Sequence, residues 1–376
     1  MSKVALITGA NGITGSAILE HLAKHTTASE WSRIIITSRS PLKTTVSDPR
    51  VEFIALDFSN PPEKLAEQMG VQCAEVTHAY FSSYVHKDDF VELNKANRSL
   101  FENFLSTLIS VSKGLQNCTL QTGGKYYNVH QRPVPWPAHE GHPRLVSAEE
   151  NFYYYQEDFL AEQQCGSNWT WNVIRPEAII GYTSKPNGMN EALTIALYFM
   201  VNKELETDAP MPTNSAYFNG TDDISDARLI ADLSIYASTH QNCANEAFNI
   251  TNCDFFSWRY MWPRLAEWFG AKASSDQVFK KTSFKENETH LDVNLEDWAR
   301  DKREVWNKLC DRLGSPESKS TFDAGTWAFQ DWVFQRTWSA PLSMNKARKF
   351  GWTGHVDSFD SFTDAFTRFK ELGQIP

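Results

Sequence analysis

The sequence predicts an α/β protein built on a doubly wound, parallel sheet and completed by a smaller α/β region that caps it. In the first half, short apolar runs rich in Val, Ile, Leu and Phe alternate with segments whose apolar residues recur every three or four positions. A glycine-rich turn directly follows the first run. This alternation is typical of parallel strands joined by helices that cover both faces of a sheet. Ligands of such sheets bind beyond the carboxyl ends of the strands, so polar residues there are the first candidates for a site.

The expected elements of the first half follow one another regularly. Strands are predicted at residues 3–8, 33–38, 51–57, 77–83, 118–122 and 170–175. Helices are predicted at residues 14–24, 62–69, 88–112 and 151–162. The helix at 88–112 places Leu100, Phe104 and Leu108 on one face. We therefore expect residues 1–183 to form the larger domain.

The second half, residues 184–376, is expected to form the smaller capping region, with some segments returning to the larger domain. It is predicted to contain a strand at 244–251 and helices at 187–203, 258–269, 344–350 and 359–372. Residues 270–320 are highly charged and are expected to form surface helices. Nine of the thirteen tryptophans lie from Trp258 onward, and we expect most of them to serve in core packing.

Composition and charge exclude several classes of protein. With 41% hydrophobic and 13% aromatic residues, the 376-residue chain suits one large or two closely packed domains and not a disordered state. A net charge of −10 argues against nucleic acid or an anionic membrane as the main partner. The apolar runs are too short for a membrane-spanning helix or a signal peptide, so a cytoplasmic protein is expected. Six cysteines without C-x-x-C spacing argue against a zinc site, and no metal is expected.

The turn after the first strand has the spacing of a dinucleotide-binding motif. Three glycines, Gly9, Gly12 and Gly15, are spaced three residues apart between the strand and an amphipathic helix. Gly9 permits a tight turn, Gly12 lets backbone N–H groups approach a pyrophosphate, and Gly15 lets helix and strand pack closely. The helix N-terminus adds positive potential at the phosphates. The sequence thus predicts a Rossmann-type domain with Gly9, Asn11, Gly12 and Ile13 at the cofactor.

The end of the second strand favours NADP(H) over NAD(H). An NAD-binding site usually places an acidic residue here for the ribose hydroxyls, and this segment has none. Arg39 instead offers a planar cation for a 2′-phosphate, with Ser38 and Ser40 as polar neighbours and Lys43 close by in sequence.

The ends of the third and fourth strands add further expected cofactor contacts. Asp57 is predicted to accept a hydrogen bond from the adenine amino group, and Phe58 to pack against the adenine ring. Ser83 and Tyr84 are expected to pass beneath the ribose and the pyrophosphate.

The expected catalytic helix departs from the short-chain dehydrogenase pattern. Those enzymes carry Tyr-x-x-x-Lys, in which the lysine lowers the pKa of the tyrosine. Here three consecutive tyrosines at 153–155 are followed, four positions later, by Glu157, Asp158 and Phe159. A lysine occurs elsewhere: Lys125 follows the fifth strand in Gln-Thr-Gly-Gly-Lys, beside the expected nicotinamide position.

These two segments resemble those of the progesterone 5β-reductase/iridoid synthase group, an atypical branch of the extended short-chain dehydrogenases. That group carries Leu-Gln-Thr-Gly-x-Lys-x-Tyr, found here at 120–127, and Asn-Phe-Tyr-Tyr-x-x-Glu-Asp, found at 151–158. Further matches extend over nearly the whole chain: Asn97, Asn103, Arg175, Pro176 and the segments 245–249, 265–270 and 343–346.

The resemblance implies a set of site residues. The second tyrosine of the triplet, Tyr154, and Lys125 are implied to be catalytic. The family's Thr-Trp pair after the fourth strand is replaced by Ser83 and Tyr84, and its second arginine after the second strand by Ser40. Further residues expected at the cofactor are Gln121, Thr122, Pro176 and Ile179. Residues expected at the substrate are Tyr84, Tyr155 and Phe329.

The resemblance also implies the reaction: NADPH-dependent 1,4-reduction of a small apolar α,β-unsaturated carbonyl compound. In this scheme the tyrosine hydroxyl stabilises the enolate oxygen, and Lys125 holds the ribose. Alternatives on the same scaffold are 1,2-reduction of a carbonyl or alcohol oxidation, a cyclisation or isomerisation, and nucleotide sensing without catalysis. The extended branch often dimerises through helices corresponding to 88–112 and 151–162, so a homodimer is expected.

Overall fold

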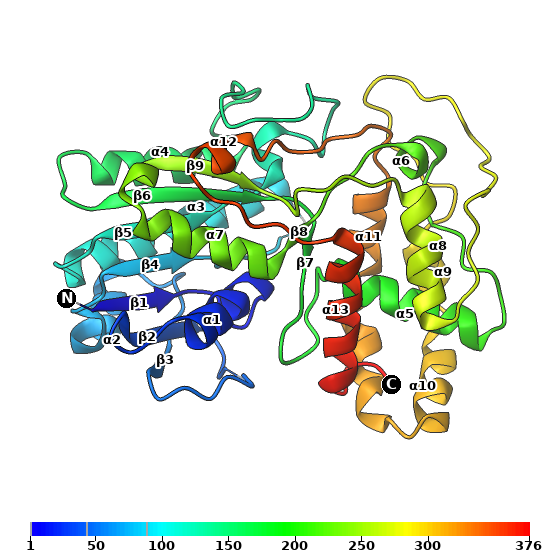
Figure 1. Cartoon of the computed structure of the whole chain (residues 1–376), viewed down its shortest axis with the longest axis horizontal. Helices are drawn as coiled ribbons and strands as arrows, with labels where there is room; N and C mark the ends of the chain where they lie inside the picture. Colours follow the sequence, from blue (N-terminus) through cyan, green and yellow to red (C-terminus); the bar gives the residue numbers. More distant parts are fainter. Residues whose placement is uncertain (1, 43, 88) are drawn as a thin grey trace.

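A parallel sheet forms one half of the molecule (Figure 1). The computed structural model describes residues 2–42, 44–87 and 89–376; Lys43 and Asp88, which entered the predictions above, lie outside this part. Within the described residues the sheet has seven strands in the order β3-β2-β1-β4-β5-β6-β9. Their bounds are β1 (Lys3–Ile7), β2 (Trp31–Ser38), β3 (Val51–Ala55), β4 (His78–Phe81), β5 (Asn117–Gln121), β6 (Thr170–Pro176) and β9 (Glu246–Ile250). The strand order reverses between β1 and β4, which is where ligands bind in such sheets.

Alternating residues of the strands face two separate apolar layers. In β1, Val4 and Leu6 contact one layer, whereas Ala5 and Ile7 contact the other. The first layer lies under α2 (Pro62–Cys73), α3 (Phe90–Val111) and α4 (Phe152–Gln164). The second lies under α1 (Ile13–His25) and α7 (Ala227–Thr239), which also pack on each other. The predicted doubly wound fold is therefore confirmed.

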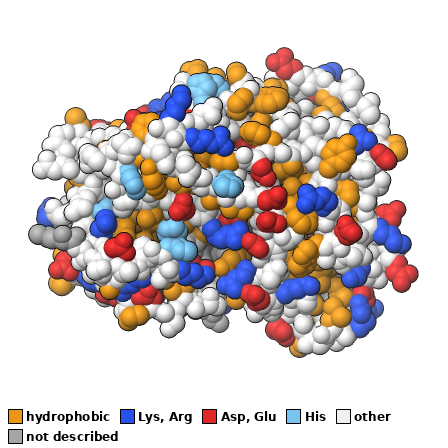
Figure 2. Space-filling model, in the orientation of Figure 1, with side chains coloured by type: hydrophobic (Ala, Val, Ile, Leu, Met, Phe, Trp, Pro, Cys, Tyr) orange, Lys and Arg blue, Asp and Glu red, His pale blue; other side chains and the backbone are white. Residues whose placement is uncertain are grey.

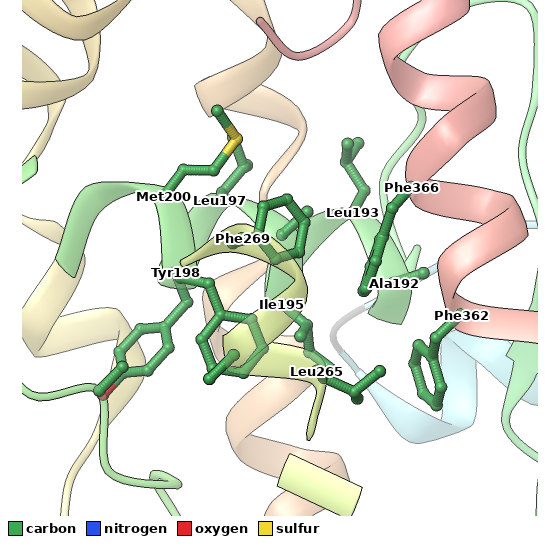
Figure 3. Packing of buried hydrophobic residues seen from close by; sticks show 14 of the residues in the cluster. Ala192, Leu193, Ile195, Leu197, Tyr198, Met200, Leu265, Phe269, Phe362 and Phe366 are labelled. Carbon is green, nitrogen blue, oxygen red and sulfur yellow. The ribbon is translucent and has the colours of Figure 1, made fainter. Parts of the chain in front are cut away.

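The other half of the molecule is a group of helices around a second apolar core (Figure 1). Its central helix, α5 (Glu191–Glu204), is buried on all sides over most of its length. Figure 3 shows Leu193 and Ile195 of this helix among side chains of α8 (Trp258–Phe269) and α13 (Ser358–Glu371). The remaining helices of this half are α6 (Ser215–Asn219), α9 (Leu295–Ala299), α10 (Arg303–Arg312), α11 (Trp327–Phe334) and the 3-10 helix η3 (Pro316–Ala324).

The late tryptophans serve mainly in this packing, as expected. Trp258, Trp262 and Trp306 are among the largest fully buried side chains. Each also donates an indole hydrogen bond, Trp258 to Asp222 and Trp262 to the carbonyl of Ala209; the indole of Trp306 donates to Ser318 O. A buried indole N–H needs such a partner, so these rings are held in one orientation.

Segments of the second half return to the sheet. The strand β9 pairs with β6, α7 covers the sheet, and α12 (Asn345–Lys349) packs on β9. Two further strands, β7 (Ile179–Ile180) and β8 (Ser225–Asp226), form a small parallel pair at the junction. The domain boundary at 183/184 stays a prediction.

Residues 270–320 were predicted to form surface helices, but only the later part of this segment is helical. Residues 273–294 contain no helix among the described residues, and helical structure begins at α9 and continues in α10 and η3. Charge alone does not produce a helix, because an exposed helix needs an apolar face to pack. Acidic and basic side chains are interspersed over the face of the molecule seen in Figure 2. None of the described helices combines the length and apolar character needed to cross a membrane.

Candidate active site

A cavity of about 750 Å³ extends from the carboxyl ends of the sheet strands to α5 and α11. All fifteen residues expected at the cofactor line it: Gly9, Asn11, Gly12, Ile13, Ser38, Arg39, Ser40, Asp57, Phe58, Ser83, Tyr84, Gln121, Thr122, Pro176 and Ile179. Lys125 and Phe329 line it as well. The strand ends that lie far apart in the sequence thus meet at one site.

The glycine turn has the geometry that a phosphate cradle requires. Gly9 has φ +64°, and a Cβ there would lie 2.9 Å from the carbonyl oxygen of Ser82. A Cβ on Gly15 would collide with the backbone of Gly9, so the helix can approach the turn this closely only with glycine there. Gly12 is the N-cap of α1 and supplies no side-chain cap. The first-turn amides of α1 therefore remain available to an anion in the cavity.

The side-chain amide of Asn11 links two serines at the end of β2. The Nδ2 of Asn11 donates to Ser38 Oγ at 3.0 Å and to Ser40 Oγ at 3.1 Å. The exposed Arg39 lies between these serines on the cavity rim, and no described carboxylate pairs with it. Its guanidinium group is thus available to an anionic ligand.

Phe58 differs from its expected role in one respect. Although it lines the cavity, its side chain is buried in the core, where its ring packs against Phe81 and Phe104. It therefore offers little ring surface for stacking on an adenine.

Lys125 and Tyr153 face the cavity from two neighbouring segments. Lys125 lies in the 3-10 helix η1 (Gly124–Tyr127) directly after β5, and its Nζ lies 4.6 Å from the centre of the Trp332 ring. Tyr153 lies in the first turn of α4, and a Cβ on Gly123 would be 3.5 Å from its hydroxyl. The Asn151 side chain joins both segments, since its Nδ2 donates to Lys125 O at 2.9 Å and its Oδ1 accepts from Tyr153 N.

The structure does not place Tyr154, the tyrosine implied to be catalytic, at the cavity. Tyr154 is completely buried, and its hydroxyl donates to the carbonyl of Tyr126 at 2.7 Å. Its ring packs beside Arg144, away from the cavity. Consecutive residues of a helix point about 100° apart, so α4 can turn only one of its three tyrosines directly toward the cavity. That residue is Tyr153.

Tyr155, expected at the substrate, is also placed elsewhere. Its hydroxyl donates to Glu102 of α3, and the Arg98 guanidinium lies 3.7 Å from its ring centre. It does not line the cavity, because α4 turns it toward α3. Tyr84 and Phe329, the other two residues expected at the substrate, do line the cavity.

The pKa of Tyr153 does not follow the short-chain dehydrogenase pattern, in which a lysine lowers the pKa of the tyrosine. Burial raises the pKa of Tyr153, and the neighbouring Tyr84 raises it further; Lys125 is not among the causes of the shift. Burial lowers the pKa of Lys125. Tyr153 is therefore a protonated phenol at neutral pH, able to donate a hydrogen bond.

The position four residues after Tyr153 has a structural role. Glu157 forms an ion pair with Arg175 at 2.7 Å, and both side chains are largely buried. The Arg175 guanidinium lies 3.4 Å from the ring centre of Tyr126. These contacts link α4, β6 and η1, and so keep the segments of Lys125 and Tyr153 together.

Sequence reasoning did not single out several individual residues that line the cavity. These are His130, Gln156, Glu177, Met189, Glu191, Trp332 and Arg336. Most come from single positions far apart in the chain, and no local motif marks them. His130 was considered and given no role as a loop histidine, but it is largely buried here, and burial lowers its pKa to about 3.

A family model described as the PRISE-like Rossmann-fold domain matches residues 5–370. The chain belongs to this family. The resemblance drawn from the Lys125 segment and the tyrosine segment is thereby confirmed, and it holds over almost the whole PRISE-like chain.

Relatives of this PRISE-like chain carry names from redox and enol chemistry. Short chain dehydrogenase gsfE of Penicillium aethiopicum is 59% identical over the full length of both chains. (S)-8-oxocitronellyl enol synthase ISY1 of Nepeta racemosa is 31% identical, over all of this chain and 93% of its own. The 3-oxo-Delta(4,5)-steroid 5-beta-reductase of Arabidopsis thaliana is 29% identical, with the same coverage.

Solved structures show the same fold at low sequence identity. The Bordetella bronchiseptica enzyme WbmG, in complex with NAD and UDP, superposes with a TM-score of 0.65 at 15% identity, over all of this chain and 97% of its own. The epimerase Mth375 of Methanothermobacter thermautotrophicus has a TM-score of 0.66 at 14% identity, over 99% of this chain and 94% of its own. The PRISE-like chain therefore shares its overall architecture with these two proteins.

Proposed function

We propose that this protein is an NADPH-dependent reductase that adds hydride to the β-carbon of a small α,β-unsaturated carbonyl compound. The observation that carries the proposal is the placement of Lys125 and Tyr153, whose segments are joined by Asn151, in the cavity that the glycine turn also lines. The relatives named as an enol synthase and as a reductase of a 3-oxo-Delta(4,5)-steroid support this reaction class.

The residues present fit a phosphorylated dinucleotide. The first-turn amides of α1 after Gly12 suit the pyrophosphate, and Arg39 with Ser40 suits a 2′-phosphate. Asp57 remains a candidate partner for the adenine amino group. Bound NADPH would supply the hydride.

Tyr153 has the properties of a hydrogen-bond donor to the substrate. Its phenol is protonated at neutral pH and largely buried, and a donor to a developing negative charge has its greatest effect away from water. It would hold the carbonyl oxygen as the enolate forms. Lys125, which is unpaired with any described carboxylate, adds positive potential on the same wall and holds the ribose. The α-carbon takes its proton from water.

The test is a screen of NADPH oxidation with enals, cyclohexenone and progesterone, with products identified by mass spectrometry and NMR. We expect a saturated carbonyl compound as the product and a strong loss of rate in Lys125→Ala. An allylic alcohol would instead show 1,2-reduction, and product formation without net NADPH consumption would show isomerisation or cyclisation. Failure of every enone to react would refute the proposal.

The homodimer expected through the helices now seen as α3 and α4 stays a prediction. Size-exclusion chromatography with light scattering tests it.

A further inference from the structure

Two tyrosine hydroxyls in the cavity have no hydrogen-bond partner among the described residues. Tyr84 follows β4, Tyr153 lies in the first turn of α4, and both line the cavity. A phenol that is partly buried normally satisfies its O–H within the protein, so these two hydroxyls are left for a ligand. Other tyrosines of the chain do bond to the protein through their hydroxyls: Tyr80, Tyr127, Tyr154, Tyr198 and Tyr217.

A ligand in the cavity can reach both hydroxyls. Fully enclosed side-chain oxygens without a partner do occur in the described part of the chain, among them Gln121 Oε1 and Thr122 Oγ1. The hydroxyl oxygens of Tyr84 and Tyr153 are not enclosed in this way. Both residues are half-buried, so each ring packs against the protein while its hydroxyl stays open to the cavity.

The two phenols lie close to each other. The ring centre of Tyr84 is 6.3 Å from that of Phe152, which in turn is 4.5 Å from that of Tyr153. The strands β4 and β5 are parallel neighbours, and a Cβ on Gly123, which follows β5, would be 3.5 Å from the Tyr153 hydroxyl. The two phenols also interact electrostatically, since Tyr84 contributes to the raised pKa of Tyr153. These contacts bring both hydroxyls into the same part of the cavity.

Both phenols are hydrogen-bond donors at neutral pH. Burial raises the pKa of Tyr84 to about 12, and it raises the pKa of Tyr153 as well. A carbonyl oxygen has two lone pairs and can accept from two donors at once. The oxygen gains negative charge when an enone becomes an enolate, so donors fixed in place beforehand bind the enolate more strongly than the enone.

We propose that Tyr84 is a second catalytic residue, whose hydroxyl donates a hydrogen bond to the same substrate oxygen as the hydroxyl of Tyr153. This inference rests on the proposed function and deepens it. When hydride forms a bond to the β-carbon, the electron pair of the carbon–carbon double bond moves toward the carbonyl carbon, and the carbonyl electron pair moves onto the oxygen. Both phenols hold this charge without giving up their protons, and water then protonates the α-carbon.

The first test is Tyr84→Phe, which keeps the ring that packs against Phe152 and removes only the hydroxyl. We expect kcat for enone reduction to fall about tenfold to a hundredfold, as one hydrogen bond to a charged group implies, with the Kd of NADPH and the melting temperature unchanged. Tyr80→Phe is the matched control, because Tyr80 lies in β4 and its hydroxyl shares a hydrogen bond with Ser238 in the core. An unchanged kcat in Tyr84→Phe would overturn the proposal. An equal loss of NADPH affinity would also overturn it, since the hydroxyl would then serve the cofactor.

A second readout requires no turnover and so separates this inference from the proposed function. The anion para-nitrophenolate, whose oxygen resembles that of an enolate, and the uncharged para-nitroanisole are titrated calorimetrically into the NADP⁺-loaded protein. We expect Tyr84→Phe and Tyr153→Phe each to weaken binding of the phenolate about tenfold and to leave binding of the anisole unchanged. Equal weakening of both ligands in Tyr84→Phe, or weakening in Tyr153→Phe alone, would overturn the pair of donors even if enones are reduced. Inactivity with every enone alongside the expected selective weakening would refute the reaction and leave the pair of donors.

Discussion

The two ends of the cavity are built in different ways. At the glycine end, the binding groups are backbone amides and short side chains from neighbouring residues of one turn, Gly9 to Ile13. At the other end, single side chains arrive from distant segments: the bond between Arg336 and Glu177 joins positions 159 residues apart. A site made from one turn leaves a compact signature in the sequence, whereas a site made from scattered side chains exists only after folding. The cavity wall with Lys125 and Tyr153 is intermediate: each residue belongs to a recognisable local segment, but only folding brings the two segments together.

The largest expected effect concerns the cavity wall with Lys125 and Tyr153. Tyr153→Phe removes the donor that faces the cavity, so we expect kcat for enone reduction to fall about 10²–10³-fold. Tyr154→Phe is the matched control, since its hydroxyl bonds to Tyr126 O inside the core; it should cost stability but keep kcat within a few-fold. The opposite ranking in steady-state kinetics would restore Tyr154 as the catalytic residue.

The second test concerns the glycine end. Arg39→Ala should weaken NADPH binding about tenfold to a hundredfold, because a charge-assisted hydrogen bond is worth about 1.5–3 kcal/mol. NADH, which lacks the 2′-phosphate, should bind almost unchanged. Fluorescence titration measures both affinities, and Arg33→Ala, which lies in β2 and is paired with Glu52, is the control. Equal weakening of both cofactors would contradict the role of Arg39.

The third test concerns the substrate end and uses pH. The pKa of Glu191 is about 8 in the fold, against an ordinary value of 4.5, so the folded chain binds the extra proton in this interval. The contribution of Glu191 to stability should then decrease as pH rises from about 5 to 8. The groups that interact with Glu191 are Asp222, Gln330, Arg336, Glu177 and Tyr217.

Glu191→Gln removes this proton, so the slope should flatten by up to about 1.4 kcal/mol per pH unit. Urea unfolding at several pH values measures it, with Glu267→Gln, at an exposed position of α8, as the control. Parallel pH profiles of the unaltered protein and Glu191→Gln would show that Glu191 is ionised in the fold.

The smallest expected effect concerns Asn151, which joins the segments of Lys125 and Tyr153. Asn151→Ala removes the N-cap of α4 and the bond to Lys125 O, so the free energy of unfolding should fall by about 1 kcal/mol. Asn294→Ala removes a comparable cap from α9, at a residue that does not line the cavity. Both variants should lose similar stability, but only Asn151→Ala should lower kcat. An unchanged kcat would mean that the cap alone matters.

Much of the fold was predictable because its signals are local. Strand ends were placed to within a few residues, as with β2 and β5, and the helix at 258–269 was placed with the correct bounds. The charged segment after residue 270 was not placed correctly, since its conformation depends on how Ala273, Phe279 and Leu291 pack against the helical core and not on its own pattern.

The sequence alone determined the glycine turn, the absence of an acidic residue at the end of β2, and the displaced Lys125. These features depend on backbone conformation and on neighbours along the chain, so a linear pattern records them. Only the tertiary structure decided that Tyr153 and not Tyr154 faces the cavity, because a rotation of α4 by one residue moves each side chain by about 100°. Only the tertiary structure brought Glu177, Glu191 and Arg336 together, because burial and mutual charge act between positions that the chain separates.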